Sequence, residues 1–104
     1  MLLGAVCLCS FGETRKIIGT AGDKAVKAYL KKIPQQAEGY YLKITPTEVV
    51  VAGRDESGLF YGLQAVEEIQ NLKLIDSKLL ESKFKEVVPL EGEAFEVRDW
   101  PSVA

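Results

Sequence analysis

The chain has 104 residues, of which 47% are hydrophobic and 27% are charged. These proportions are typical of a folded protein and exclude an intrinsically disordered one, and the length suits a single domain over residues 1–104. The formal net charge of -2 gives no attraction for phosphate backbones, so we expect no nucleic-acid binding. Histidine is absent, which removes the commonest metal ligand and the commonest general base near neutral pH.

Residues 1–11 are apolar and contain Cys7 and Cys9. On a strand these two side chains would share a face, roughly 6.5–7 Å apart, at the edge of the reach of a disulfide. Two buried thiols are the favoured interpretation, since a lone C-x-C motif cannot complete a usual zinc site. The segment is either a first strand or a truncated secretory signal without its basic part. It is too short to cross a membrane as a helix, so we expect no membrane span.

Arg15–Gly19 predicts a short strand, and Thr20–Asp23 a turn that ends in a helix N-cap at Asp23. A helix should follow from Lys24 to Ile33 and stop before Pro34, because the residue before a proline avoids the α region. Its predicted buried stripe is Ala25, Val26, Tyr29, Leu30 and Ile33. The lysines between them favour a solvated face over a ligand-binding one.

Tyr40–Thr45 and Glu48–Ala52 predict an antiparallel hairpin, joined at Pro46-Thr47. A second helix should begin after an N-cap at Asp55 or Ser57. Its apolar positions, at three- and four-residue intervals, are Leu59, Leu63, Val66 and Ile69.

Gly58 and Gly62 lie in the first turns of this second helix, where each glycine costs up to about 1 kcal/mol relative to alanine. Four residues apart, they share a face. This cost indicates a close approach of the helix either to the sheet or to a neighbouring domain.

The C-terminal third is less regular. Residues 76–86 predict either a third helix or a solvated excursion, residues 89–93 a loop, and Ala94–Arg98 a last strand. The fold class is therefore α+β, with a small, mostly antiparallel sheet and two to three helices packed on one face.

Three motifs resemble known enzymes. Val50–Gln64 (VVAGRDESGLFYGLQ) resembles the strand, acidic turn and G-x-x-Y-[GA]-L-Q helix of the domain that precedes the barrel in β-N-acetylglucosaminidases of glycoside hydrolase families 20 and 84. Residues 22–42, with GDKAV, IP and EGYYL in order, look like that domain in bacterial family 84 enzymes. Val97–Val103 (VRDWPSV) is similar to its exit into the first barrel strand. The stretch 71–93 is longer than the resemblance predicts.

The resemblance implies a parent hydrolase of β-N-acetylglucosaminides, whose barrel carries the acidic residues of a substrate-assisted mechanism. This chain stops at Ala104, before a barrel would begin. We therefore expect a non-catalytic accessory domain with no catalytic residue, cofactor or metal of its own, whose partner is the barrel of the same polypeptide. Enzymes of this type are often exported, so an extracytoplasmic parent is expected. The alternatives are a carbohydrate-binding module and a stand-alone interaction domain.

Other candidate sites have plainer interpretations. Gly19–Gly22 lacks the spacing of a phosphate-binding loop and reads as a turn. Glu67 and Glu68 point about 100° apart on a helix and favour a solvated face.

Among the aromatic residues, Tyr40 and Phe60 are expected in the core. Tyr61, beside the glycine pair, and Trp100, at the exit, are candidates for contact with the barrel, since aromatic residues are enriched in interface centres. The candidate interdomain residues are Gly58, Tyr61, Gly62 and Trp100.

Overall fold

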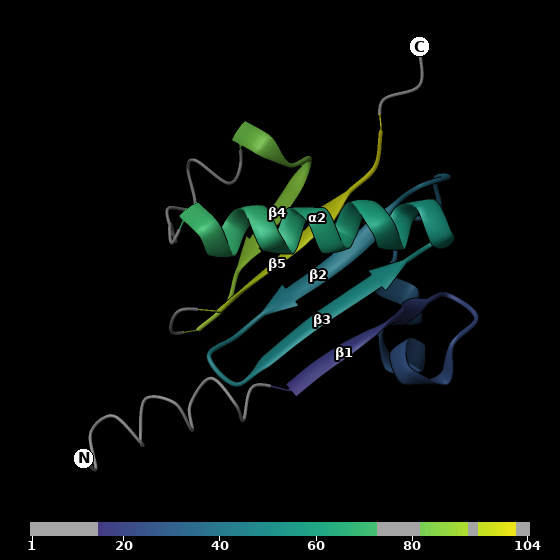
Figure 1. The fold of residues 1–104 in the computed structure, drawn as a ribbon, viewed down its shortest axis with the longest axis horizontal. Helices are drawn as coiled ribbons and strands as arrows, with labels where there is room; N and C mark the ends of the chain where they lie inside the picture. The colour runs from purple at the N-terminus through teal and green to yellow at the C-terminus, as the bar shows by residue number, and fades with distance from the viewer. Residues whose placement is uncertain (1–14, 73–81, 92–93, 102–104) are drawn as a thin grey trace.

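Five strands form one mixed sheet in the computed structural model, which describes residues 15–72, 82–91 and 94–101 (Figure 1). The strand order is β1-β3-β2-β5-β4, with β1 parallel to β3 and the other three pairings antiparallel. In chain order the elements are β1 Arg15–Thr20, the 3-10 helix η1 Lys24–Lys32, β2 Tyr40–Ile44, β3 Glu48–Gly53, α2 Glu56–Leu72, β4 Glu86–Pro89 and β5 Phe95–Asp99. The α+β class and the mostly antiparallel sheet are confirmed.

The predicted hairpin is confirmed as β2 and β3, which lie at the centre of the sheet with Leu42 opposite Val51. Thr45 closes its turn, because its side-chain Oγ1 accepts a hydrogen bond of 2.8 Å from the amide of Glu48. The amide of Thr45 in turn donates to the Glu48 carbonyl at 2.9 Å. These paired bonds set the register between the two strands.

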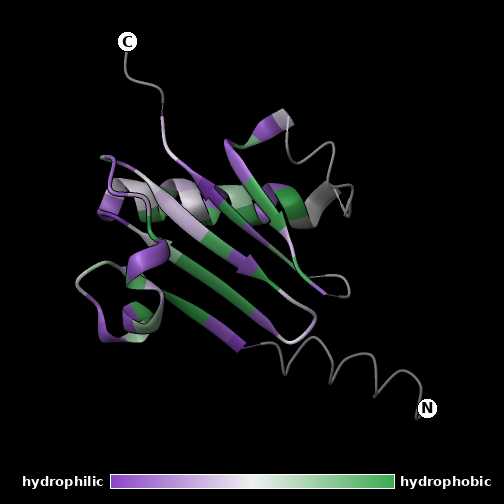
Figure 2. Cartoon of the chain, turned by 180° about the vertical axis from the view of Figure 1, so that it is seen from behind, coloured by the Kyte–Doolittle hydropathy of each residue, from purple (hydrophilic) through white to green (hydrophobic). Residues whose placement is uncertain are grey.

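The two helices lie on opposite faces of the sheet, which corrects the expected packing on one face (Figures 1 and 2). Tyr40 and Leu42 belong to the core under α2, whereas Tyr41 belongs to the core under η1. The physical reason is the apolar run Val49–Ala52, whose alternate residues are buried on alternate faces. Such an unbroken apolar run is typical of a strand covered on both sides.

The first predicted helix is present but differs in kind, since η1 is a 3-10 helix with a non-helical residue at Val26. Val26 and Ile33 are buried as expected, while Leu30 is 42% exposed. Asp23 stands at the N-cap position without a capping hydrogen bond. Its Oδ2 instead accepts bonds from the Thr20 amide at 2.7 Å and the Thr20 hydroxyl at 3.2 Å. In a phosphate-binding loop, backbone amides are available to the phosphate. In the turn 20–23, the Asp23 carboxylate accepts the hydrogen bond of the Thr20 amide instead.

The second helix begins where Asp55 predicts. The Asp55 Oδ1 accepts a hydrogen bond of 2.8 Å from the amide of Gly58, which is N-cap geometry, and this confirms Asp55 as the cap. The other oxygen, Oδ2, accepts a bond of 3.0 Å from the amide of Glu38, a residue with a positive φ of 63°. One side chain therefore ties the start of α2 to the loop before β2.

Arg54 also binds the loop before β2. Its Nε donates to the Pro34 carbonyl at 2.8 Å and one terminal nitrogen donates to the Ile33 carbonyl at 2.9 Å. Its own amide donates to the Gly39 carbonyl at 2.8 Å. We call the assembly of Arg54, Asp55 and loop 33–39 the loop lock, because both charged side chains bind loop backbone atoms.

The C-terminal part is confirmed in one element and corrected in another. The last strand is confirmed as β5, whereas β4 occupies Glu86–Pro89, where the sequence predicts the end of a helix or solvated excursion and the start of a loop. Most of the third predicted helix, together with Cys7 and Cys9, lies outside the described residues. No helix in the described part of the chain has the length and apolar character needed to span a membrane.

Candidate functional site

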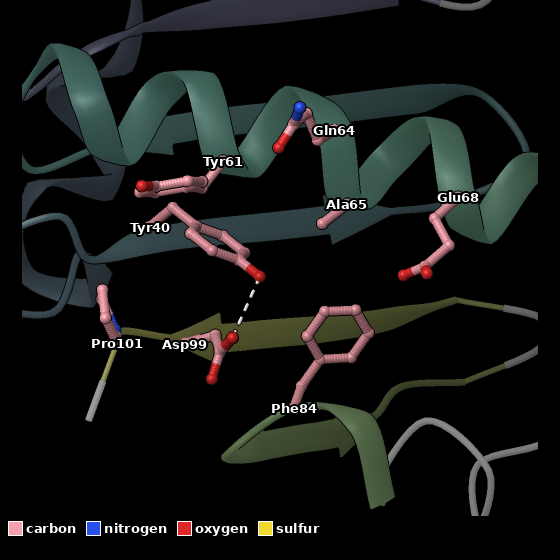
Figure 3. Close-up of a pocket in the computed structure, with 8 residues that line it drawn as sticks. All are labelled: Tyr40, Tyr61, Gln64, Ala65, Glu68, Phe84, Asp99 and Pro101. Carbon is pink, nitrogen blue, oxygen red and sulfur yellow. Dashed lines mark hydrogen bonds between the residues drawn. The ribbon is translucent and has the colours of Figure 1, made fainter.

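A groove of about 420 Å³ runs between α2 and the C-terminal end of β5 (Figure 3). Helix α2 contributes four residues between Tyr61 and Glu68, and β2 contributes Tyr40. The other wall comes from the residue before β4 and from the end of β5 and the residues after it. Its lining residues are Tyr40, Tyr61, Gln64, Ala65, Glu68, Phe84, Asp99 and Pro101. Segments distant in the sequence therefore meet where the chain leaves the sheet.

Tyr40 lies at the base of the groove and is only 5% exposed, as its predicted core position requires. Its hydroxyl donates to Asp99 Oδ2 at 3.1 Å, and the backbone amide of Lys85 donates to Asp99 Oδ1 at 3.1 Å. Burial, together with the charges of Asp99 and Glu68, raises the pKa of the Tyr40 phenol far above its usual value. The phenol therefore stays protonated and the carboxylate stays the acceptor.

The exposed surface of α2 carries three large apolar residues: Phe60 is 57% exposed, and Tyr61 at 42% and Leu63 at 40% lie on either flank of it. The rings of Phe60 and Tyr61 meet edge to face, with their centroids 5.9 Å apart. The predicted burial of Phe60 is wrong because it follows the inward-facing Gly58 by two residues, about 200° around the helix. We call Phe60, Tyr61 and Leu63 the exposed helix patch.

Gly58 and Gly62 both face inward, toward the chain's own sheet and loop. A Cβ added to Gly58 would lie 2.2 Å from the Gly39 carbonyl oxygen, and one added to Gly62 would lie 2.9 Å from a methyl group of Val51. The close approach predicted from these glycines is thus made to their own domain. As interdomain contacts they remain a prediction, while Tyr61 does present its ring to solvent.

Trp100 follows β5 directly and is half-buried. The ammonium of Lys85 lies 5.7 Å from its ring centroid, within cation–π range. Its neighbours Asp99 and Pro101 line the groove, so Trp100 stands beside it. Of the candidate interdomain residues, Tyr61 lines the groove and Trp100 lies next to it, and their contact with a barrel stays a prediction; Gln64, Asp99 and Glu68 line the groove without having been predicted as site residues.

The groove combines two carboxylates with aromatic side chains. Its ionisable groups are the two carboxylates and two tyrosines, and Glu68 is also solvated, as predicted for Glu67 and Glu68. Within residues 15–72, 82–91 and 94–101, no group of three or more carboxylate or thiol side chains is placed to hold a metal ion.

A second polar cluster lies on the η1 face. Glu96 accepts a 2.5 Å hydrogen bond from the hydroxyl of Tyr41 and pairs with the ammonium of Lys32 at 2.6 Å. Burial alone would raise the pKa of Glu96, but the bonds from Lys32 and Tyr41 outweigh it and lower that pKa. Tyr29 stacks on Tyr41, with centroids 5.7 Å apart.

Replacing Tyr41 with phenylalanine is expected to lower the free energy of unfolding by about 1 kcal/mol, because a buried charge-assisted bond to Glu96 is lost. Tyr29→Phe is the matched control, since its hydroxyl makes only a 3.3 Å bond to Glu48. Urea unfolding measures both. Equal losses for the two variants would show that the Tyr41–Glu96 hydrogen bond stabilises the fold no more than the Tyr29–Glu48 bond does.

The fold and the groove together define a small α+β domain. It carries aromatic side chains beside a groove at the point where the chain leaves the sheet after β5. The chain belongs to glycosyl hydrolase family 20, domain 2, whose family model matches residues 12–100. It is thus an accessory domain of a hexosaminidase-type glycosidase, and the resemblance to family 20 is confirmed. The resemblance to family 84 stays a prediction.

Proposed function

We propose that this chain is a non-catalytic accessory domain that packs against the catalytic barrel of a glycoside hydrolase acting on β-N-acetylglucosaminides. The packing surface is the exposed helix patch together with the adjoining groove. An exported parent enzyme, with the barrel following in the same polypeptide, is part of the proposal.

The observation that carries the proposal is the exposed helix patch. Contiguous exposed apolar residues mark sites of protein interaction, and aromatic residues are enriched at the centres of interfaces. Here Phe60, Tyr61 and Leu63 lie on one helix, beside a groove that Pro101 helps to line. A domain that continues from this exit would therefore begin next to the patch.

The test uses a polypeptide that carries this domain together with its barrel. Changing both Phe60 and Leu63 to serine should lower the docking free energy by about 2 kcal/mol, because two apolar side chains lose their buried environment. The measurement is the rate of thermal inactivation of hydrolysis of a chromogenic β-N-acetylglucosaminide, which should increase in the double variant.

Leu30→Ser is the matched control, because Leu30 is 42% exposed on the opposite face of the sheet. It should leave the inactivation rate unchanged. Equal effects of the Leu30 variant and the double variant would contradict docking through α2. Separately, the 104-residue chain by itself should release nothing from the chromogenic substrate, and turnover that follows the purified chain would contradict a non-catalytic role.

A further inference from the structure

Asp99 ends β5 and connects three segments of the chain at the exit from the sheet. Its Oδ2 accepts a hydrogen bond of 3.1 Å from the Tyr40 hydroxyl (Figure 3). Its Oδ1 accepts one of 3.1 Å from the backbone amide of Lys85. Tyr40 begins β2 and lies directly opposite Asp99, whereas Lys85 immediately precedes β4. One carboxylate therefore binds residues at the starts of both strands that flank β5, and we call Asp99, Tyr40 and Lys85 the exit clamp.

The sheet around the exit clamp is held on both faces. On the α2 face, the Tyr40 side chain is only 5% exposed and belongs to the core. On the η1 face, Arg98 donates through Nε to the Lys32 carbonyl at 2.7 Å, and its Nη1 pairs with Glu86 Oε1 at 2.6 Å. The residue before Asp99 is thus bound to η1 and to β4. The clamp therefore starts from a fixed strand end.

The two residues after the clamp have little conformational freedom of their own. Proline fixes its own φ and restricts the backbone of the residue before it, so Pro101 limits both itself and Trp100. Trp100 is half-buried, and the Lys85 ammonium lies 5.7 Å from its ring centroid. Lys85 thus binds Asp99 through its amide and contacts Trp100 through its side chain. Because few free torsions separate Asp99 from Pro101, the direction of the chain at Pro101 depends on how Asp99 is held.

The residue type at position 99 also indicates a specific role. Aspartate is depleted in strands, and a valine would suit the end of β5 better, but a valine side chain could accept neither hydrogen bond. Departures from local propensity are expected at functional sites. The aspartate therefore indicates that the two hydrogen bonds at this position matter more than strand propensity does.

We infer that Asp99 is a positioning residue for the following domain: it fixes the direction in which the chain leaves β5 and so holds the barrel against the exposed helix patch. This inference rests on the proposed function, because it assigns the residue that orients the docking partner. A stiff connection raises the effective concentration of one tethered surface at the other and lowers the entropic cost of docking. Asp99 thus strengthens docking without any contact of its own with the barrel.

The first experiment measures NMR relaxation of the Trp100 backbone amide and indole in the 104-residue chain. The order parameter should be about 0.85 in the wild type and below about 0.6 in Asp99→Ala, which loses both hydrogen bonds. Asp99→Asn should keep the wild-type value, because its amide oxygen can accept from Lys85 while its nitrogen donates to the Tyr40 oxygen. This rescue separates the geometry of the clamp from the charge of Asp99.

Glu96→Ala is the matched control, because Glu96 lies on the same strand and accepts a tyrosine hydrogen bond on the opposite face. It should leave the Trp100 order parameter unchanged. The hairpin amides in the same spectra report whether each variant is folded. If Asp99→Ala is unfolded, Tyr40→Phe takes its place, since it keeps the buried ring and removes one bond of the clamp, and an intermediate order parameter is expected. An unchanged value in the clamp variant, or an equal fall in Glu96→Ala, would overturn the inference.

The second experiment uses the polypeptide that carries the barrel and follows hydrogen exchange of the amides in the exposed helix patch. The protection ratio is the exchange rate in the 104-residue chain divided by that in the longer polypeptide, measured for the same variant, so that a loss of domain stability affects both rates. Asp99→Ala should lower this ratio about two- to tenfold, the equivalent of one hydrogen bond. Asp99→Asn and Glu96→Ala should leave it unchanged.

The wild-type ratio separates the two proposals. A ratio of one in the wild type would contradict docking through α2, and with it the inference. A ratio above one that Asp99→Ala leaves unchanged would overturn only the role of Asp99, while the docking itself would stand.

Discussion

Replacing Gly58 with alanine is expected to lower the free energy of unfolding by about 3 kcal/mol, as overpacking against fixed atoms does at its upper range. The direction is unusual, because alanine in a helix interior ordinarily stabilises by about 1 kcal/mol over glycine. Here the new Cβ would lie 2.2 Å from the Gly39 carbonyl oxygen and 3.1 Å from the Glu38 carbonyl carbon. Both contacts are to backbone atoms of a loop that Arg54 and Asp55 hold, so the loop cannot move away cheaply.

Urea unfolding followed by circular dichroism measures this loss, with Gly22→Ala as the matched control. Nothing lies within 4 Å of a Cβ added at Gly22, which is exposed. The control should therefore stay within about 0.5 kcal/mol of the wild type. A Gly58→Ala variant that unfolds at the wild-type urea concentration would contradict the tight contact between α2 and the loop.

Replacing Asp55 with alanine should cost about 2 kcal/mol. Loss of an N-cap costs about 1 kcal/mol, and the Glu38 amide, left without its acceptor, adds a similar amount. Ser57→Ala is the matched control, since Ser57 is exposed and the sequence alone leaves it as the alternative cap. Thermal and urea unfolding measure both variants. A larger loss for Ser57→Ala than for Asp55→Ala would reverse the assignment of the cap.

The same site predicts a dependence on pH. Hydrogen bonds from the Glu38 and Gly58 amides hold the pKa of the Asp55 carboxyl below its ordinary value. A carboxyl whose pKa is lower in the folded state stabilises the fold fully above its unfolded pKa and loses that contribution as the pH falls through the folded pKa. Wild-type stability should thus decline from about pH 5 downward, and Asp55→Asn should decline less steeply. Glu96, whose pKa is also lowered, leaves a residual slope.

The central elements of the fold could be predicted because their signals are local. The hairpin 40–52 and the cap at Asp55 are defined by residues within a few positions of each other, and both are confirmed. The two-faced packing also had a signal that was missed, the unbroken apolar run Val49–Ala52. Strand β4 could not be predicted, because four residues at a sheet edge that include Pro89 carry almost no strand pattern.

Helix η1 and the groove show two further limits of sequence patterns. The sequence predicts a helix here without its type, and the non-helical Val26 interrupts the nine residues of η1, so no continuous period distinguishes a 3-10 helix from an α-helix. The groove is assembled from residues near positions 40, 61–68, 84 and 99–101, which only the folded sheet brings together. Tyr61 was singled out as an aromatic residue beside glycines, and Asp99 belongs to the VRDWPSV motif, but neither feature indicates that the two side chains line one groove.

The run Gly53–Gly58, which is part of the motif that resembles the glycosidase domain, has a structural explanation. Arg54 and Asp55 bind loop backbone atoms, and a Cβ added at Gly53 would lie 2.2 Å from the amide nitrogen of Leu59. These residues therefore build the loop lock, and the groove lies further along α2. A mutation in the lock is therefore expected to act on stability.

The central position of the β2–β3 hairpin also has a consequence for how the chain folds. Its two strands are joined by a short turn, so they pair at little cost in loop-closure entropy, whereas β1 and β5 join it from distant parts of the chain. The hairpin offers one free edge to β1 and the other to β5, and η1 follows β1 along the chain, whereas α2 follows β3 of the hairpin itself. The domain is therefore expected to assemble outward from Tyr40–Gly53, with its N-terminal and C-terminal halves docking independently on either side.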